Sequence, residues 1–143
     1  MKENSLIAES RTHMDYVALV EQYVVNKVSS KQRGYIFVDT PECAYKPPLI
    51  GNYRPDLYFC HDNKLIIGEA KTVGDYDRLH SKDQYITYLK ECKNFKGESI
   101  LILCSSWTIS LSYKTLIKYL KRQNGFDTKV VIISELKSSE IYV

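Results

Sequence analysis

The sequence lacks any apolar run long enough to cross a membrane. The longest runs, at residues 100–104 and 130–133, span only a few positions, whereas a membrane-spanning helix needs about 20. The first residues, Met-Lys-Glu-Asn-Ser, carry charges and no apolar stretch, so we expect no signal peptide. We therefore expect a cytoplasmic protein with no membrane partner.

The chain also has few cysteines and a small net charge, and each limits the functions open to it. The four cysteines, Cys43, Cys60, Cys92 and Cys104, include no Cys-x-x-Cys pair, so we expect buried thiols rather than a zinc site. Lys and Arg exceed Asp and Glu by only 20 to 17, and the net charge of +3 permits a nucleic-acid partner without requiring one. Neither a Ser-His-Asp arrangement nor a glycine-rich phosphate loop is present.

What is present is an alternation of helix and strand patterns. The length of 143 residues predicts one domain over residues 1–143, and 44% hydrophobic with 26% charged residues is ordinary for a globular protein. The patterns predict an α/β fold in the order α-β-β-β-α-β-α-β, with helices on both faces of a mixed central sheet. The expected elements are a helix over 14–28, strands at 35–38, 57–60 and 65–71, a helix from Ser81, a strand at 99–104, a helix over 113–120 closed by Gly125, and a strand at 129–134.

Two local signals mark the central part of the chain. Four prolines fall between Pro41 and Pro55, which predicts a functional loop of roughly fifteen residues. Further on, Ser81-Lys82-Asp83-Gln84 has the Ser-x-x-Gln pattern of a helix capping box. We therefore expect the second helix to begin at Ser81.

The hairpin before that helix brings two acidic residues together. A two-residue turn at Asp62-Asn63 places Asp56 directly opposite Glu69 on the neighbouring strand. Facing like charges destabilise a sheet unless something neutralises them, and a divalent cation such as Mg²⁺ would do so. Strand alternation puts the Lys71 side chain on the same face, while Ala70 points the other way and leaves its carbonyl as a further ligand.

These residues resemble the signature of the PD-(D/E)XK nuclease superfamily. Pro55-Asp56, twelve intervening residues and Glu69-Ala70-Lys71 match its motif, and Gln84 matches a glutamine often found in its following helix. The order of elements is similar to the restriction-endonuclease-like core of that superfamily. Two branches are indicated: Asp77-Arg78-Leu79-His80-Ser81 is similar to the VRR-NUC pattern, and the spacing from Glu21 to the first strand resembles Holliday-junction resolvases.

The resemblance implies a metal-dependent DNA endonuclease that hydrolyses phosphodiester bonds. Asp56, Glu69 and the Ala70 carbonyl would bind Mg²⁺, for which Mn²⁺ would substitute. Lys71 would orient or deprotonate the attacking water with the help of Gln84, unless Lys71 simply reaches solvent and Gln84 only caps its helix. The first helix would add an acid to the site, and Glu21 is a better candidate than Glu9. The alternative is that both are solvent-exposed acids of this helix.

The expected substrate is double-stranded or branched DNA, and cutting both strands favours a homodimer or higher homo-oligomer. Two other functions stay open: an inactive nuclease-fold module for DNA binding or assembly, and a small α/β binding protein whose acids are accidental. Basic residues of the third helix would contact phosphates or form a solvated face; they are Lys114, Lys118, Lys121 and Arg122. Other candidate phosphate contacts are Lys46, Arg54, Arg78 and Lys82.

Overall fold

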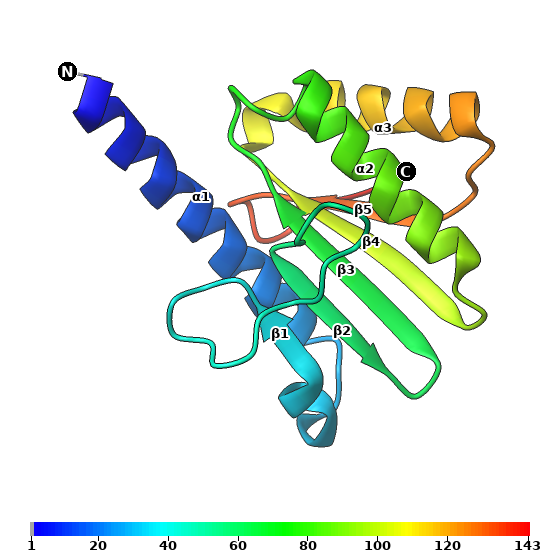
Figure 1. Ribbon diagram of the computed structural model, residues 1–143. Helices are drawn as coiled ribbons and strands as arrows, with labels where there is room; N and C mark the ends of the chain where they lie inside the picture. The colour runs from blue at the N-terminus through cyan, green and yellow to red at the C-terminus, as the bar shows by residue number, and fades with distance from the viewer. Residues whose placement is uncertain (1) are drawn as a thin grey trace.

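A six-stranded mixed sheet forms the centre of the molecule (Figure 1). The computed structural model describes the backbone of residues 2–143 and the side chains from Thr12 onward. Its helices are α1 (Lys2–Val25), α2 (Leu79–Asn94) and α3 (Ser110–Asn124), with 3₁₀ segments η1 (Ser30–Tyr35) and η2 (Trp107–Ile109). Its strands are β1 (Ile36–Val38), β2 (Leu57–His61), β3 (Lys64–Ala70), β4 (Glu98–Cys104), β5 (Lys129–Ile133) and β6 (Glu140–Tyr142).

The strands lie in the order β1-β2-β3-β4-β5-β6, which agrees with the predicted mixed α/β fold. β1, β2 and β3 are antiparallel, β3, β4 and β5 are parallel, and β6 returns antiparallel to β5. β6 and the two 3₁₀ segments were not predicted, because their few residues carry no periodic pattern. Within residues 2–143, no helix combines the length and the apolar character needed to cross a bilayer.

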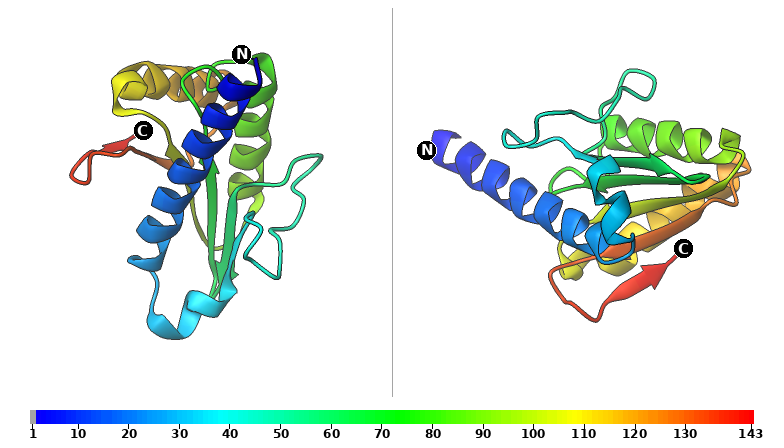
Figure 2. Two further views of the ribbon diagram at one scale, coloured as in Figure 1. Left: turned by 90° about the vertical axis from the view of Figure 1, so that its left-hand side faces the viewer. Right: turned by 90° about the horizontal axis from the view of Figure 1, so that it is seen from below.

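Helices cover both faces of the sheet, as predicted. Leu65 and Ile67 of β3 pack with residues of α2 and α3 on one face. Ile66, the residue between them, packs against α1 on the other face, as the alternation of side chains along a strand requires. Two further views show the loop between β1 and β2 standing away from this layered body (Figure 2).

Helix α1 is longer than the apolar stripe that predicted it. Val17, Val20 and Val24 are fully buried, but Met14 is only half-buried and the helix ends at Val25 rather than at residue 28. It begins at Lys2, and its first turns extend past the edge of the sheet (Figure 1). Those turns lie before the buried stripe, so the apolar spacing could not predict them.

The β2–β3 hairpin has the predicted turn and register. Asp62 and Asn63 have φ values of 50° and 62°, the left-handed conformation that a two-residue type I′ turn requires. Tyr58 pairs with Ile67 and Leu57 with Gly68. The same register carried one step further places residue 56 opposite residue 69.

Of two local expectations in the central part of the chain, one is wrong and one is confirmed. Helix α2 begins at Leu79 and its N-cap is Arg78, so Ser81 and Gln84 do not form a capping box. The Ser81 hydroxyl instead donates to the Asp75 carbonyl at 2.6 Å, because the chain before α2 folds back as a turn. The predicted loop over 41–55 is present, and it is fixed locally, since Ile50 and Tyr53 form a bridge and Ile50 packs against α2.

Gly68 sets how closely α1 approaches the sheet. A Cβ atom at this position would lie 2.6 Å from Cγ1 of Val20 and 3.1 Å from Cβ of Leu57. Both neighbours are fully buried, so neither has free space into which to move. The close contact of α1 with β3 therefore depends on glycine.

We expect Gly68→Ala to lower the free energy of unfolding by about 1–3 kcal/mol, the usual cost of overpacking a core. Urea denaturation measures this loss. Gly74→Ala is the matched control, because a Cβ atom there would meet nothing within 4 Å and should leave stability nearly unchanged. Equal stability of the two variants would contradict the role assigned to Gly68.

Candidate active site

Two buried carboxylates meet where β2 begins and β3 ends. Asp56 directly precedes β2, and Glu69 is the penultimate residue of β3. Their exposed fractions are only 6% and 3%, although acidic residues are rarely so buried without a partner. The predicted pairing of these two residues is therefore accompanied by unusual burial.

Asp56 is held from three sides. Its Oδ2 accepts a hydrogen bond from the Ala70 backbone at 2.8 Å and lies 3.3 Å from Nε2 of His13. Its backbone carbonyl accepts from the amide of Asp39 at 2.8 Å. Residues of β3 and α1 thus orient the carboxylate of Asp56, and the residue after β1 holds its backbone.

Glu69 is less well satisfied. Among the described residues, its Oε2 and the neighbouring hydroxyl of Tyr88 on α2 are both buried without a hydrogen-bond partner. Burial raises the pKa of Glu69 well above its ordinary value of 4.5, and the negative charge of Asp56 raises it further, while Lys71 opposes the shift. The carboxylate of Glu69 thus has one like charge near it, that of Asp56, and one opposite charge, that of Lys71.

Lys71 is a buried lysine rather than one that reaches solvent. Its ammonium group donates to Oε1 of Gln84, and the two residues are 7% and 8% exposed. The backbone amide of Lys71 donates to the Cys104 carbonyl at 2.9 Å, which extends the pairing of β3 with β4. Gln84 therefore positions the Lys71 side chain next to Glu69, and it has no capping role.

His13 joins the cluster from α1, and the sequence analysis did not identify it. The hydrogen bond to Asp56 raises the pKa of His13, burial opposes this, and the backbone of Ala70 adds a smaller rise. The imidazole therefore lies beside both Asp56 and Ala70, two of the predicted ligands. Its position four residues before Val17 continues the buried stripe of α1 and was the signal that could have revealed it.

Glu21, the acid expected from the first helix, is not brought to Asp56. It lines a different hollow with Arg33, Thr40 and Cys43. Eight residues separate it from His13, about 12 Å along the helix axis. The side chain of Glu9, the other candidate, lies outside the residues whose side chains are described.

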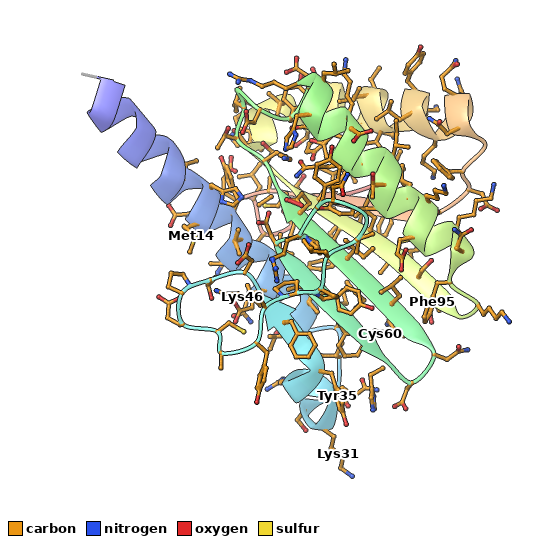
Figure 3. The ribbon with its side chains drawn as sticks, in the orientation of Figure 1. Met14, Lys31, Tyr35, Lys46, Cys60 and Phe95 are labelled. Carbon is orange, nitrogen blue, oxygen red and sulfur yellow. The ribbon has the colours of Figure 1, made fainter. Side chains whose placement is uncertain are left out.

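The four predicted DNA contacts lie on the loop between β1 and β2 and at the start of α2. Lys46, labelled in Figure 3, lies 3.7 Å from Asp39 and donates to the Thr40 carbonyl. The Arg54 guanidinium donates to the Pro47 carbonyl at 2.6 Å, so it stabilises the loop before β2. Arg78 pairs with Asp75 at 3.3 Å, and Lys82 is half-buried in the first turns of α2.

The donor set fits a hard divalent cation. No cluster of three or more His, Cys, Asp or Glu side chains suited to a metal occurs in the part of the chain that is described, which disfavours zinc. Mg²⁺ needs fewer protein ligands, because it binds through one or two carboxylates and keeps several waters. Asp56, the free oxygen of Glu69 and the Ala70 carbonyl could hold such an ion, and Mn²⁺ accepts the same oxygen ligands.

Comparisons of the chain with protein-family models, with curated proteins and with solved structures found no match. Any functional assignment of this cluster therefore depends on its geometry and chemistry alone.

We expect Glu69→Gln to stabilise the metal-free protein increasingly as the pH rises above 4.5. A carboxyl group whose pKa is raised by folding contributes its full stability below its unfolded pKa, and this contribution is lost as the pH rises toward the folded pKa. Glutamine has no charge to lose, so the difference in free energy of unfolding should vanish near pH 4 and grow toward neutrality. Urea denaturation in EDTA measures it.

The matched control is Glu91→Gln, an exposed acid of α2. This variant should follow the wild-type pH profile. A constant offset of Glu69→Gln from wild type at every pH would mean that the buried carboxylate does not titrate as described.

Proposed function

We propose that the chain is a metal-dependent endonuclease with a restriction-endonuclease-like core, which hydrolyses phosphodiester bonds of DNA through a PD-(D/E)XK site. The observation that carries this proposal is the convergence of Asp56, Glu69 and Lys71, all nearly inaccessible, at one edge of the sheet. A sheet gains no stability from burying two facing carboxylates. A role in binding a cation explains why the two carboxylates lie together better than chance does.

Mg²⁺ bound at the two carboxylates would supply Lewis-acid activation of a phosphate oxygen and of a water molecule. Asp56 is well suited to bind it, because Ala70 and His13 already fix its orientation. Glu69 contributes an oxygen that no protein group satisfies among the described residues.

Lys71 would act on the attacking water or on the charge that develops on the phosphate. Its ammonium group is held by Gln84 and lies within electrostatic range of Glu69. Fixing a long, flexible side chain in this way removes the entropy cost of placing it during the reaction. Gln84 is accordingly a positioning residue in this proposal.

His13 occupies the place in the site that we expected an acid of the first helix to occupy. When protonated, it balances the charge of Asp56; when neutral, it offers a nitrogen beside the Ala70 carbonyl. In either state it orients Asp56. We therefore propose His13, rather than Glu21, as the contribution of α1 to the site.

An inactive nuclease-fold module for DNA binding or assembly is the alternative. The presence of Asp56, Glu69 and Lys71, with Gln84 bound to the lysine, argues against it, because a binding surface has no use for two buried acids. The described part of the chain contains one such site, so cutting both strands of a duplex would require two copies, which favours a homodimer or higher homo-oligomer.

We expect Asp56→Asn and Glu69→Gln each to abolish cleavage while the proteins remain folded, because both substitutions keep the shape of the side chain and remove its charge. Lys71→Met should slow cleavage by about 10²–10⁴-fold. The assay uses plasmid, branched and single-stranded DNA with Mg²⁺ or Mn²⁺. Glu98→Gln, an exposed acid at the far end of β4, is the control and should cleave normally. Wild-type rates in the Asp56 variant would exclude a metal site here.

A second experiment separates the two candidates of α1. His13→Ala should reduce cleavage by about 10–100-fold, the usual effect of losing a group that orients a ligand. Glu21→Gln should leave the rate nearly unchanged, because its side chain lies in another hollow. Initial rates at saturating Mg²⁺ measure both. The reverse order of effects would restore Glu21 to the site.

A further inference from the structure

Helix α3 carries an uncompensated row of positive charge. Its 15 residues include four cations and no Asp or Glu. Because the whole chain has a net charge of only +3, the rest of the molecule is close to neutral and the excess is concentrated on this helix. A local field of this kind attracts a partner far better than the net charge indicates.

Three of the cations form a line along the helix. Lys114, Lys118 and Arg122 follow one another at intervals of four residues, which places them about 6 Å apart along one face. Lys121 differs, because its ammonium group donates to the Val143 carbonyl at 2.9 Å and burial lowers its pKa. The row therefore consists of Lys114, Lys118 and Arg122, which we call the α3 row.

This spacing is unfavourable for an isolated helix. Like charges four residues apart destabilise a helix by about 0.2–0.5 kcal/mol for each pair. No ion pair to any of the three is found among the described side chains. If this face of α3 were only solvated, nothing in the described structure would offset the repulsion among the three cations.

The row also borders two open hollows. One, of about 500 Å³, lies against Tyr119, and the other, of about 350 Å³, lies against Phe126 and Tyr142. Tyr119 and Tyr142 are 57% and 52% exposed. A row of cations between hollows lined by aromatic rings can follow an anionic backbone and contact the groups beside it.

The fold connects this row to the proposed active site. α3 packs on the same face of the sheet as α2, which is the face that contains Glu69 and Lys71. Its first residue, Ser110, follows the end of β4 by six residues, and Cys104 at that end is bonded to Lys71. Helix α3 therefore begins at the end of the sheet where the site lies, and the α3 row faces a hollow that Tyr142 of β6 also lines.

We propose that the α3 row binds the phosphate backbone of a nucleic-acid duplex several nucleotides away from the scissile bond. This inference rests on the proposed nuclease function for its choice of partner, and it adds a substrate that extends along α3. The three cations would meet phosphates of one strand, while the acids of the active site repel the backbone until a cation neutralises them.

Binding is measured by fluorescence anisotropy with a labelled DNA duplex in EDTA over a salt series, so that no cleavage occurs. The α3 variant is Lys114→Gln/Lys118→Gln/Arg122→Gln, which keeps good helix formers. The control removes the same charge elsewhere, as Lys31→Gln/Lys90→Gln/Lys96→Gln. All three control positions are exposed, and Lys31 lies at the opposite end of the molecule from α3 (Figure 3).

The slope of log K against log salt should decrease by about 0.9 for each lost contact, or nearly three for the α3 variant. The control should keep the wild-type slope. If the α3 variant does not fold, Lys118→Gln alone should reduce the slope by about one. Equal slopes for the two triple variants would overturn the proposal. The proposal would also be overturned if the α3 variant lost binding to vesicles of equal parts phosphatidylcholine and phosphatidylserine but kept its binding to DNA.

A small substrate separates this inference from the nuclease function. Hydrolysis of bis(p-nitrophenyl) phosphate should be equal in wild type and the α3 variant, whereas KM for the long duplex should rise in the variant. Binding that depends on α3 without any hydrolysis would uphold the α3 row and reject the nuclease. Hydrolysis of both substrates with unchanged KM would uphold the nuclease and reject the α3 row.

Discussion

The register of the β2–β3 hairpin is the constraint on which the proposed site depends. Asp62 and Asn63 fix the turn, and the paired strands then carry Asp56 and Glu69 to opposite positions at the other end. Because side chains alternate along a strand, a slip of one residue would turn Glu69 away from α2 and into the face of α1. Lys71 would lose Gln84 at the same time. Asp56 and Glu69 each lie six residues from the turn, and yet the turn determines which way their side chains point.

The approach of α1 is the second constraint, and glycine controls it. Val20 packs where a side chain at Gly68 would stand, and two helical turns earlier the same face presents His13 to Asp56. The close contact of Val20 with Gly68 thus sets the distance between α1 and the sheet, and with it the position of His13 relative to Asp56. The site is assembled from segments 43 residues apart in sequence, so packing rather than local chain geometry unites them.

Local chemistry explains which features the sequence could predict. The turn residues, the strand alternation and Gly125 with its φ of 68° at the end of α3 all act over a few residues, and each prediction from them is confirmed. For Gln84 the sequence left two roles open, helix capping and assistance to Lys71, because both place a glutamine at this position; the structure shows the contact with Lys71 and no capping role. His13 was missed because the apolar spacing of α1 indicates which face of the helix packs on the sheet, but not that Asp56, 43 residues later, will lie against it. Those two outcomes are decided by tertiary packing, which periodicity does not report.

The cluster at Glu69 and the α3 row share one physical property: each gathers like charges that the described part of the chain does not fully neutralise. Their signs are opposite, which gives them different roles toward a polyanion. The α3 row would attract a phosphate backbone at any time, whereas Asp56 and Glu69, when ionised, would repel it until a metal is bound. Substrate bound by α3 would therefore enter the active site with its scissile phosphate only when a cation is bound there. In this arrangement the binding of nucleic acid and the binding of metal strengthen one another, because each removes a repulsion that opposes the other.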